Sequence, residues 1–192
     1  MLRCLSRNVY YLVPNAYLGV PALVHRYRAE GDTAAGRFDD AHKEVALGLA
    51  ALPGDTFFPI ELVPAWEKAG HKQEAEELFK RCLAAQEKVC TDYPNCPWVH
   101  NSAAWLCACC RRDLDSGLEH ALKATTLAPA SAGNLDTLGE IYFQRGDKDK
   151  AVAAEKKAIG LDPDRAYFHK QLKRIEAGDP TADRPPETED DD

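Results

Sequence analysis

The chain has no apolar run long enough to cross a membrane, although 45% of its 192 residues are hydrophobic. A membrane helix needs roughly 20 uninterrupted apolar residues. The nearest candidate, residues 2–24, is interrupted by Pro14 and Pro21, and no small-x-small cleavage site follows it. The sequence therefore predicts neither a membrane span nor a secretory signal.

Basic residues are not in excess either, because 24 Lys and Arg stand against 31 Asp and Glu, for a formal net charge of -7. Nucleic-acid binding normally requires a basic patch or stripe, so DNA and RNA are not expected as partners. Acidic residues crowd positions 187–192, after the Pro-containing run 179–186. Such a composition stays solvated, which predicts a disordered acidic tail over 179–192.

Recognisable catalytic motifs are also missing. The sequence contains no G-x-S-x-G nucleophile elbow and no H-E-x-x-H zinc motif, and its glycines occur singly, without a phosphate-binding loop. We therefore predict that the chain is not an enzyme and has no catalytic residues and no cofactor.

The cysteine count is odd, at seven, which excludes a complete internal disulfide framework and favours a reducing, cytoplasmic setting. The only cluster to weigh as a metal site is formed by Cys90, Cys96, Cys107, Cys109 and Cys110. Their spacing runs mostly along helices, which makes tetrahedral convergence awkward, whereas cysteine packs readily as a small hydrophobe.

The histidines form no metal-binding motif and are interpreted as surface or hydrogen-bonded groups. They are His25, His42, His71, His100, His120 and His169. Taken together, the cysteines and histidines lead to a prediction of no metal site.

A small residue recurs at one position along the chain, at Ala41, Ala75, Gly117 and Ala151, with intervals of 34, 42 and 34 residues. A fixed period of this length marks supersecondary units that bury their apolar faces by stacking on one another. The sequence therefore predicts an array of helix pairs whose function lies in a binding surface.

The clearest unit covers residues 132–165. Leu138 and Tyr142 share one helical face, Gly139 is small enough for a second helix to approach closely, and Gly146 can end the first helix in a left-handed conformation. The pattern resembles the tetratricopeptide repeat, and the matching residues are Leu135, Leu138, Gly139, Tyr142, Gly146, Asp147, Ala151, Ala158 and Pro163. Only Glu155, where an aromatic residue is usual, departs from it.

The preceding unit, 98–131, has Trp105 at the position of Gly139 and Arg112 at that of the turn glycine. We expect Trp105 in the core, because large apolar residues on a packed face usually serve packing. The corner between the helices is expected to use Asp113 and Asp115 as caps.

Unit 56–97 contains eight surplus residues. Its stretch 73–92 lacks Gly and Pro, which predicts a second helix about two turns longer than usual. Unit 22–55 has a weak first half, where a short or shifted helix would bury Leu23 and Tyr27.

The resemblance implies an all-α fold, a TPR-like α-solenoid of antiparallel helix pairs. A capping helix is expected over 166–178, after the four units 22–55, 56–97, 98–131 and 132–165. Residues 1–21 are expected to form an N-terminal helical or irregular segment. Its tyrosines, Tyr10, Tyr11 and Tyr17, either pack under the first helix or support self-association at this edge.

The resemblance also implies a protein-protein interaction module that binds a peptide or partner protein on its concave face. The candidate peptide-binding residues are Ile60, Glu67, Ser102, Cys109, Asp136, Glu140, Phe143, Lys170 and Arg174. Their mixed charge favours a basic or helical guest. Two alternatives stay open: these charges are the solvated face of the helices, or the chain is a structural scaffold, a C-terminal cap or a regulatory appendage of a larger complex.

Overall fold

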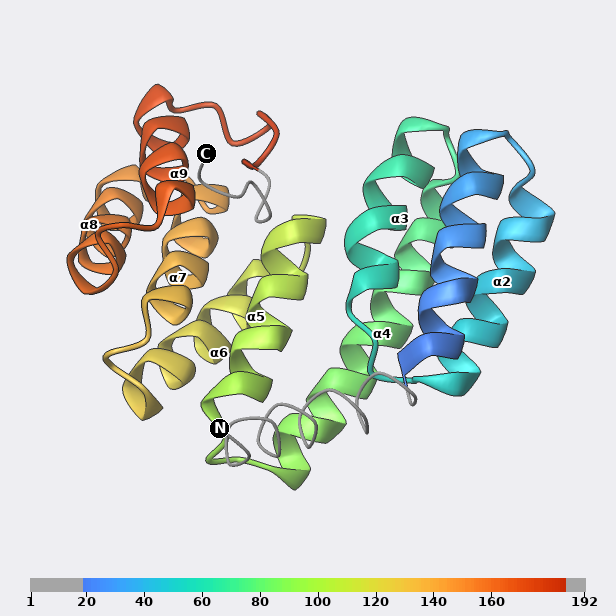
Figure 1. Ribbon diagram of the computed structural model, residues 1–192, viewed down its shortest axis with the longest axis horizontal. Coiled ribbons are helices and arrows are strands. Elements are labelled where there is room, and N and C mark those ends of the chain that lie inside the picture. The colour runs from blue at the N-terminus through green and yellow to red at the C-terminus, as the bar shows by residue number, and fades with distance from the viewer. Residues whose placement is uncertain (1–18, 186–192) are drawn as a thin grey trace, which may run out of the picture. The chain divides into compact units, whose positions relative to one another are not determined.

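The computed structural model describes residues 19–185. The N-terminal tyrosines and the acidic end of the chain lie outside the described residues, so the predictions made for them stay predictions. Within the described part, every regular element is a helix and no strand occurs (Figure 1). This confirms the all-α prediction. The chain divides into two compact units, one ending at Ala85 and the other beginning at Gln86.

The first unit begins with the helical residues 19–34. It continues through α2 (Phe38–Ala51), α3 (Phe57–Lys68) and the first part of α4 (Lys72–Asp92), which contains the boundary between the units. Helix α4 has 21 residues against 14 in α2. Its length agrees with the prediction, because the stretch lacks glycine and proline and is rich in strong helix formers.

Small residues let the helices of the first unit approach closely. Ala29 and Ala41 are fully buried. A Cβ added to Gly48 of α2 would lie 2.2 Å from a ring carbon of Phe58 in α3, so no larger residue fits there without movement. Trp66 of α3 is among the largest buried side chains, and its ring N–H donates a hydrogen bond to Thr33 Oγ1 at 2.9 Å.

The prediction for the first helix is wrong in its buried face. Leu23 and Tyr27 are 39% and 60% exposed, whereas Ala22 and Ala29 are fully buried. Alanines seven residues apart share one helical face, and their size allows closer contact than Leu or Tyr would. The helix is also not short, since it continues to residue 34.

After the last residues of α4, the second unit consists of two helix pairs and one further helix (Figure 1). The first pair is α5 with α6, the second is α7 with α8, and α9 packs against α8. Both helices of the first pair also contact α7. The bounds are α5 (Pro97–Cys110), α6 (Leu114–Leu127), α7 (Ala132–Gln144), α8 (Lys148–Leu161) and α9 (Ala166–Ala177).

Gly117 shows why the recurring small residue is needed. A Cβ at this position of α6 would lie 2.7 Å from Ile141 Cδ1 of α7 and 2.8 Å from Cys107 Cβ of α5. Three helices therefore meet where only a hydrogen atom fits. The equivalent Ala151 in α8 is fully buried.

The two turns inside the pairs differ as their sequences indicate. Gly146, between α7 and α8, has a φ of 86°, as predicted. The α5–α6 corner has no glycine and instead places Arg111 and Asp113 in the left-handed region, with φ values of 53° and 46°. The predicted caps do not form there, because Asp113 makes no side-chain cap hydrogen bond and Asp115 pairs with Arg145.

Candidate peptide-binding surface

The centre of the candidate surface is a buried ion pair between α7 and α9. Glu140 is fully buried, and Arg174 donates to both of its carboxylate oxygens, at 2.7 and 3.1 Å. Gln171 adds a third donor at 3.0 Å. The guanidinium of Arg174 also lies 5.0 Å from the ring centroid of Phe143. These contacts compensate the cost of burying both charges.

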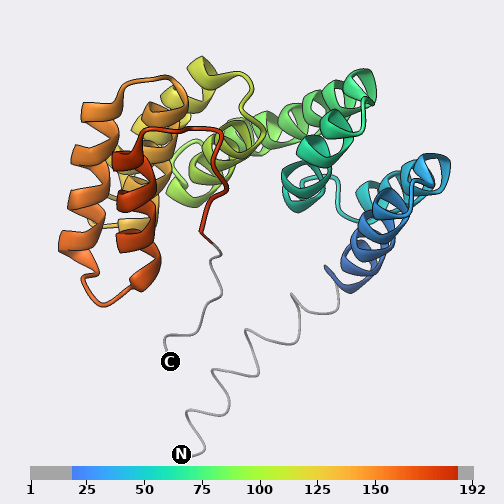
Figure 2. The same ribbon diagram turned by 90° about the horizontal axis from the view of Figure 1, so that it is seen from above.

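Residues 179–185 lie on this surface. They leave the end of α9 and turn back toward α5 (Figures 1 and 2). Arg174 Nε donates to the carbonyl of Ala182 at 3.0 Å, and Gln144 Nε2 donates to the carbonyl of Pro180 at 3.1 Å. The same Gln144 nitrogen also donates to Glu140 at 2.7 Å. The segment is therefore attached through its main chain, independently of most of its side chains.

Arg184, near the end of this segment, contacts α5. Its guanidinium carbon lies 5.2 Å from the ring centroid of Trp105 in α5, within the range of a cation–π interaction. The charge of Arg184 also interacts with that of Glu140. Trp105 is half-buried, so it is not the enclosed core residue that the sequence predicts. Its ring face instead supports a cation.

Residues 179–185 make these contacts, although the composition predicts a disordered tail over 179–192. A segment rich in proline and acidic residues is typically solvated. Its composition does not show, however, whether neighbouring side chains bind its main-chain carbonyls. The remaining tail residues, 186–192, lie outside the described residues.

Further acidic side chains lie beneath the same surface. Glu155 of α8 is fully buried, and its Oε2 lies 3.4 Å from where a Cβ on Gly139 would stand. Burial raises the pKa of Glu155 to about 7, and the negative charge of Glu140 acts in the same direction, whereas the neighbouring Asp136 lowers it. The place usually given to an aromatic residue thus holds a carboxylic acid that ionises near neutral pH.

Five of the candidate residues are buried in the second unit, and Arg174 contacts both Glu140 and Phe143. The five are Cys109, Asp136, Glu140, Phe143 and Arg174. The solvated-face interpretation is therefore wrong for this group. Two other candidates stand outside it: Lys170 is exposed and Ser102 is half-buried.

Ile60 and Glu67 belong to α3 of the first unit, where Ile60 is half-buried and Glu67 is exposed. Sequence reasoning missed four residues that make the contacts of the surface: Gln144, Gln171, Trp105 and Arg184. Trp105 stood out in the sequence, but nothing in the local pattern connects it to Arg184.

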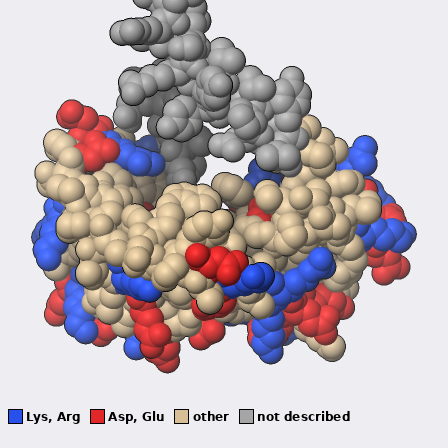
Figure 3. All heavy atoms as spheres, turned by 90° about the horizontal axis from the view of Figure 1, so that it is seen from below, with Lys and Arg blue, Asp and Glu red and all other residues tan. Residues whose placement is uncertain are grey.

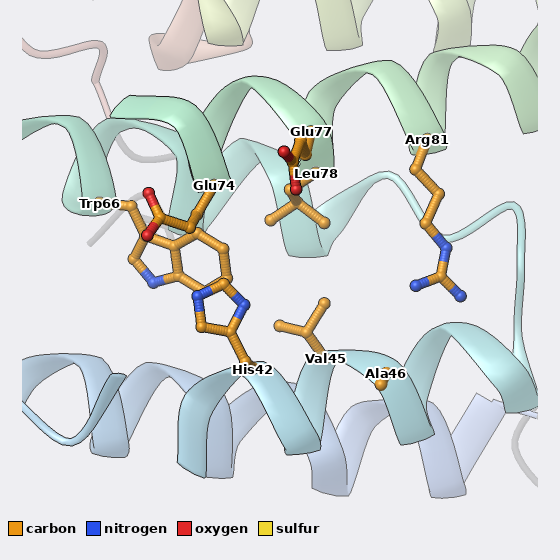
Figure 4. Close-up of a pocket in the computed structure, with 8 residues that line it drawn as sticks. All are labelled: His42, Val45, Ala46, Trp66, Glu74, Glu77, Leu78 and Arg81. Atoms are coloured by element: carbon orange, nitrogen blue, oxygen red, sulfur yellow. The ribbon is translucent and has the colours of Figure 1, made fainter. Parts of the chain in front are cut away.

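A separate pocket of about 270 Å³ lies in the first unit, between α2, α3 and α4 (Figure 4). Val45 and Leu78 supply apolar wall, and Glu77 and Arg81 supply charge. None of the candidate residues lines it.

The molecular surface carries charges of both signs. On the face shown in Figure 3, Lys and Arg alternate with Asp and Glu, and the described residues form no continuous basic area there. None of the helices in the described part of the chain combines the length and the apolar content that a membrane span requires.

A family model for the tetratricopeptide repeat matches residues 132–165. The match confirms the resemblance for this unit, which contributes α7 and α8. No curated protein matches the chain.

Two solved structures are similar to the chain at low identity. MamA from Desulfovibrio magneticus RS-1 is 19% identical, with 83% of this chain and 86% of that chain covered and a TM-score of 0.48. TTC0263, a thermophilic TPR protein of Thermus thermophilus, is also 19% identical, with 81% of each chain covered and a TM-score of 0.49.

Proposed function

Because this chain contains a tetratricopeptide repeat, we propose that it is a non-catalytic protein-protein interaction module whose second unit binds a peptide. The binding surface is formed by α5, α7 and α9, around Trp105, Glu140 and Arg174. The observation that carries the proposal is that the chain's own residues 179–185 already lie there, with a turn over 179–182 in which the N–H of Ala182 donates to the carbonyl of Asp179 at 3.2 Å.

Main-chain recognition provides the affinity. Arg174 and Gln144 bind the carbonyl oxygens of Ala182 and Pro180, main-chain atoms that a peptide of another sequence also offers when it adopts the same turn. A guest in the same conformation would make the same hydrogen bonds, each worth about 1 kcal/mol net and more where the donor is charged. These contacts hold a peptide in place but do not select its sequence.

Selectivity comes from the place that Arg184 occupies. A guanidinium at this position stacks on the Trp105 ring and is attracted by the negative charge of Glu140. A Lys would lose the planar stacking and an acidic residue would be repelled. The preferred guest is therefore a basic peptide with an arginine two residues after the residue whose carbonyl binds Arg174.

The chain's own segment competes with such a guest. A tether of a few residues gives the segment an effective concentration on the order of millimolar, so a free peptide must displace it. We therefore propose that the docked segment occupies the surface in the same molecule. It would lower the apparent affinity of the surface for a partner.

The test uses full-length protein and a labelled synthetic peptide of residues 179–185. Arg184→Ala in the protein weakens the docked segment, so the peptide is expected to bind at least tenfold more tightly than to the wild type. Asp183→Ala, a change at the exposed neighbour, is the matched control and should leave affinity unchanged.

Two further variants test the surface itself. Replacing the arginine of the peptide by alanine should abolish binding, and adding Trp105→Ala to the Arg184→Ala protein should do the same. If the folded Arg184→Ala protein binds no peptide, the proposal is wrong, and a role as scaffold, cap or regulatory appendage is favoured instead. The cytoplasmic location stays a prediction, to be checked by cell fractionation.

A further inference from the structure

Among the described residues, one group of side chains has the composition and spacing of a metal site. Cys90 near the end of α4, His100 of α5 and His120 of α6 place one potential ligand atom each within 4.8 Å of one another. Cys90 and His100 are 5% and 2% exposed, and His120 is half-buried. All three belong to the second unit, and none is on the peptide-binding surface described above.

The hydrogen bonds of His100 fix its tautomer. Its Nε2 lies 3.0 Å from the carbonyl oxygen of Pro94. A carbonyl can only accept, so Nε2 carries the proton and Nδ1 of the neutral ring presents a lone pair.

His120 is held in the same way. Its Nε2 lies 3.0 Å from Glu87 Oε1, an oxygen that also accepts from Ser116 Oγ at 3.1 Å. An ionised carboxylate only accepts, so Nδ1 of neutral His120 also presents a lone pair. Carbonyl and carboxylate partners on the far nitrogen are what metal-ligating histidines usually have, because they orient the ring and raise its basicity.

The two Nδ1 atoms lie 2.9 Å apart, while the ring centroids are 5.1 Å apart. The rings therefore meet through their Nδ1 edges. Two lone pairs at this distance repel, and the arrangement is favourable only if an electropositive centre sits between or beside them. That centre is either an extra proton, shared as imidazole and imidazolium, or a metal ion.

The neighbouring thiol favours the metal. Cys90 Sγ supplies the soft ligand that a shared proton does not need, and at present it donates weakly to the carbonyl of Val99 at 3.5 Å. Two imidazole nitrogens and one thiolate with an open fourth position are a donor set that Zn²⁺ accepts. Zn–N bonds of about 2.0–2.1 Å in a tetrahedron put the nitrogens about 3.3 Å apart, a small movement from their present distance.

We propose that Cys90, His100 and His120 bind Zn²⁺ and thereby join α4, α5 and α6. Each ligand comes from a different helix, so the ion would tie the end of the long helix to the first helix pair of the second unit. On binding, the Cys90 thiol loses its proton to solvent, and the S–H bond is replaced by an S–Zn bond.

The test adds Zn²⁺ or Co²⁺ alone to metal-free full-length protein. Zn²⁺ should bind at one ion per chain and raise the melting temperature, and Co²⁺ should give a thiolate-to-cobalt charge-transfer band. Cys90→Ser keeps the size of the side chain and should remove this band. His120→Gln should weaken Zn²⁺ binding at least tenfold.

Two matched controls accompany these variants. Cys96→Ser changes the half-buried cysteine beside Cys90, and His169→Gln changes an exposed histidine that likewise contacts a proline carbonyl. Both should bind metal as the wild type does. Absence of the cobalt band together with an unchanged melting temperature in Zn²⁺ would overturn the proposal and leave a proton-sharing histidine pair. An unaltered band in Cys90→Ser would overturn it as well, by placing the metal on other cysteines.

Discussion

Arg174 and Glu140, 34 residues apart in the sequence, form a two-point ion pair with side chains only 6% and 0% exposed. The pair joins α9 to α7, and the same guanidinium holds the carbonyl of Ala182. One arginine therefore serves both the packing of the last helix and the attachment of the segment that follows it.

Arg174→Ala is expected to lower the free energy of unfolding by about 3–5 kcal/mol, because it leaves the Glu140 carboxylate buried without its main partner. Urea unfolding followed by circular dichroism measures the change. Lys173→Ala, next to it on the exposed face of α9, should change stability by no more than about 0.5 kcal/mol. A loss below about 1 kcal/mol for Arg174→Ala would show that Glu140 is not enclosed.

Glu155 makes the stability of the protein depend on pH. Its folded pKa of about 7 lies above the ordinary value of 4.5, so the folded state binds the proton more tightly than the unfolded chain. Stability from this group is present at low pH and is lost as pH rises from about 4.5 to about 7, by an amount on the order of 3 kcal/mol.

Glu155→Gln should therefore stabilise the protein at about pH 8 and have little effect at about pH 5, because the amide stays neutral at both. Urea unfolding at the two pH values measures this. Glu119→Gln, at an exposed site of α6, is the control and should be neutral at both. Equal effects of Glu155→Gln at the two pH values would contradict the raised pKa.

The helix pairs could be predicted because their determinants are local. Gly117 and Gly146 mark a close contact and a left-handed turn, and each is recognised within one repeat. The face of the first helix was mispredicted because the repeat pattern expects large apolar residues, whereas Ala22 and Ala29 pack there. Period alone does not say how closely two helices approach.

The functional groups were harder to predict, because their partners come from distant segments. Glu140 is buried through Arg174, and Trp105 meets Arg184 from beyond the last helix. His100 and His120 are candidates for a metal site only because folding brings their Nδ1 atoms together. None of these pairings leaves a motif at fixed spacing, so no local pattern could have found them.

Asp136→Lys combined with Glu140→Lys illustrates the difference. From the sequence, where both residues are candidates for the peptide-binding face, this double change would be expected to abolish partner capture and leave folding intact. With Asp136 5% and Glu140 0% exposed, two lysines would bury positive charge beside Arg174, and we expect the second unit to lose its cooperative unfolding transition. Circular dichroism melting measures this, and a native-like transition would contradict the burial.

Gly117→Ala tests the place where α5, α6 and α7 meet. The added Cβ would lie 2.8 Å from Cys107 Cβ, an atom fixed to its backbone, and 2.7 Å from the end of Ile141, which can move. Overpacking of this kind costs about 1–3 kcal/mol and should outweigh the gain in helix propensity, which is at most about 1 kcal/mol.

Gly160→Ala is the matched control, because no atom lies within 4 Å of its added Cβ, and it should stabilise α8 by about 0.5–1 kcal/mol. Opposite signs in urea unfolding are therefore expected for the same chemical change in two helices. If both substitutions stabilised the protein, the three helices would be further apart than the structure places them.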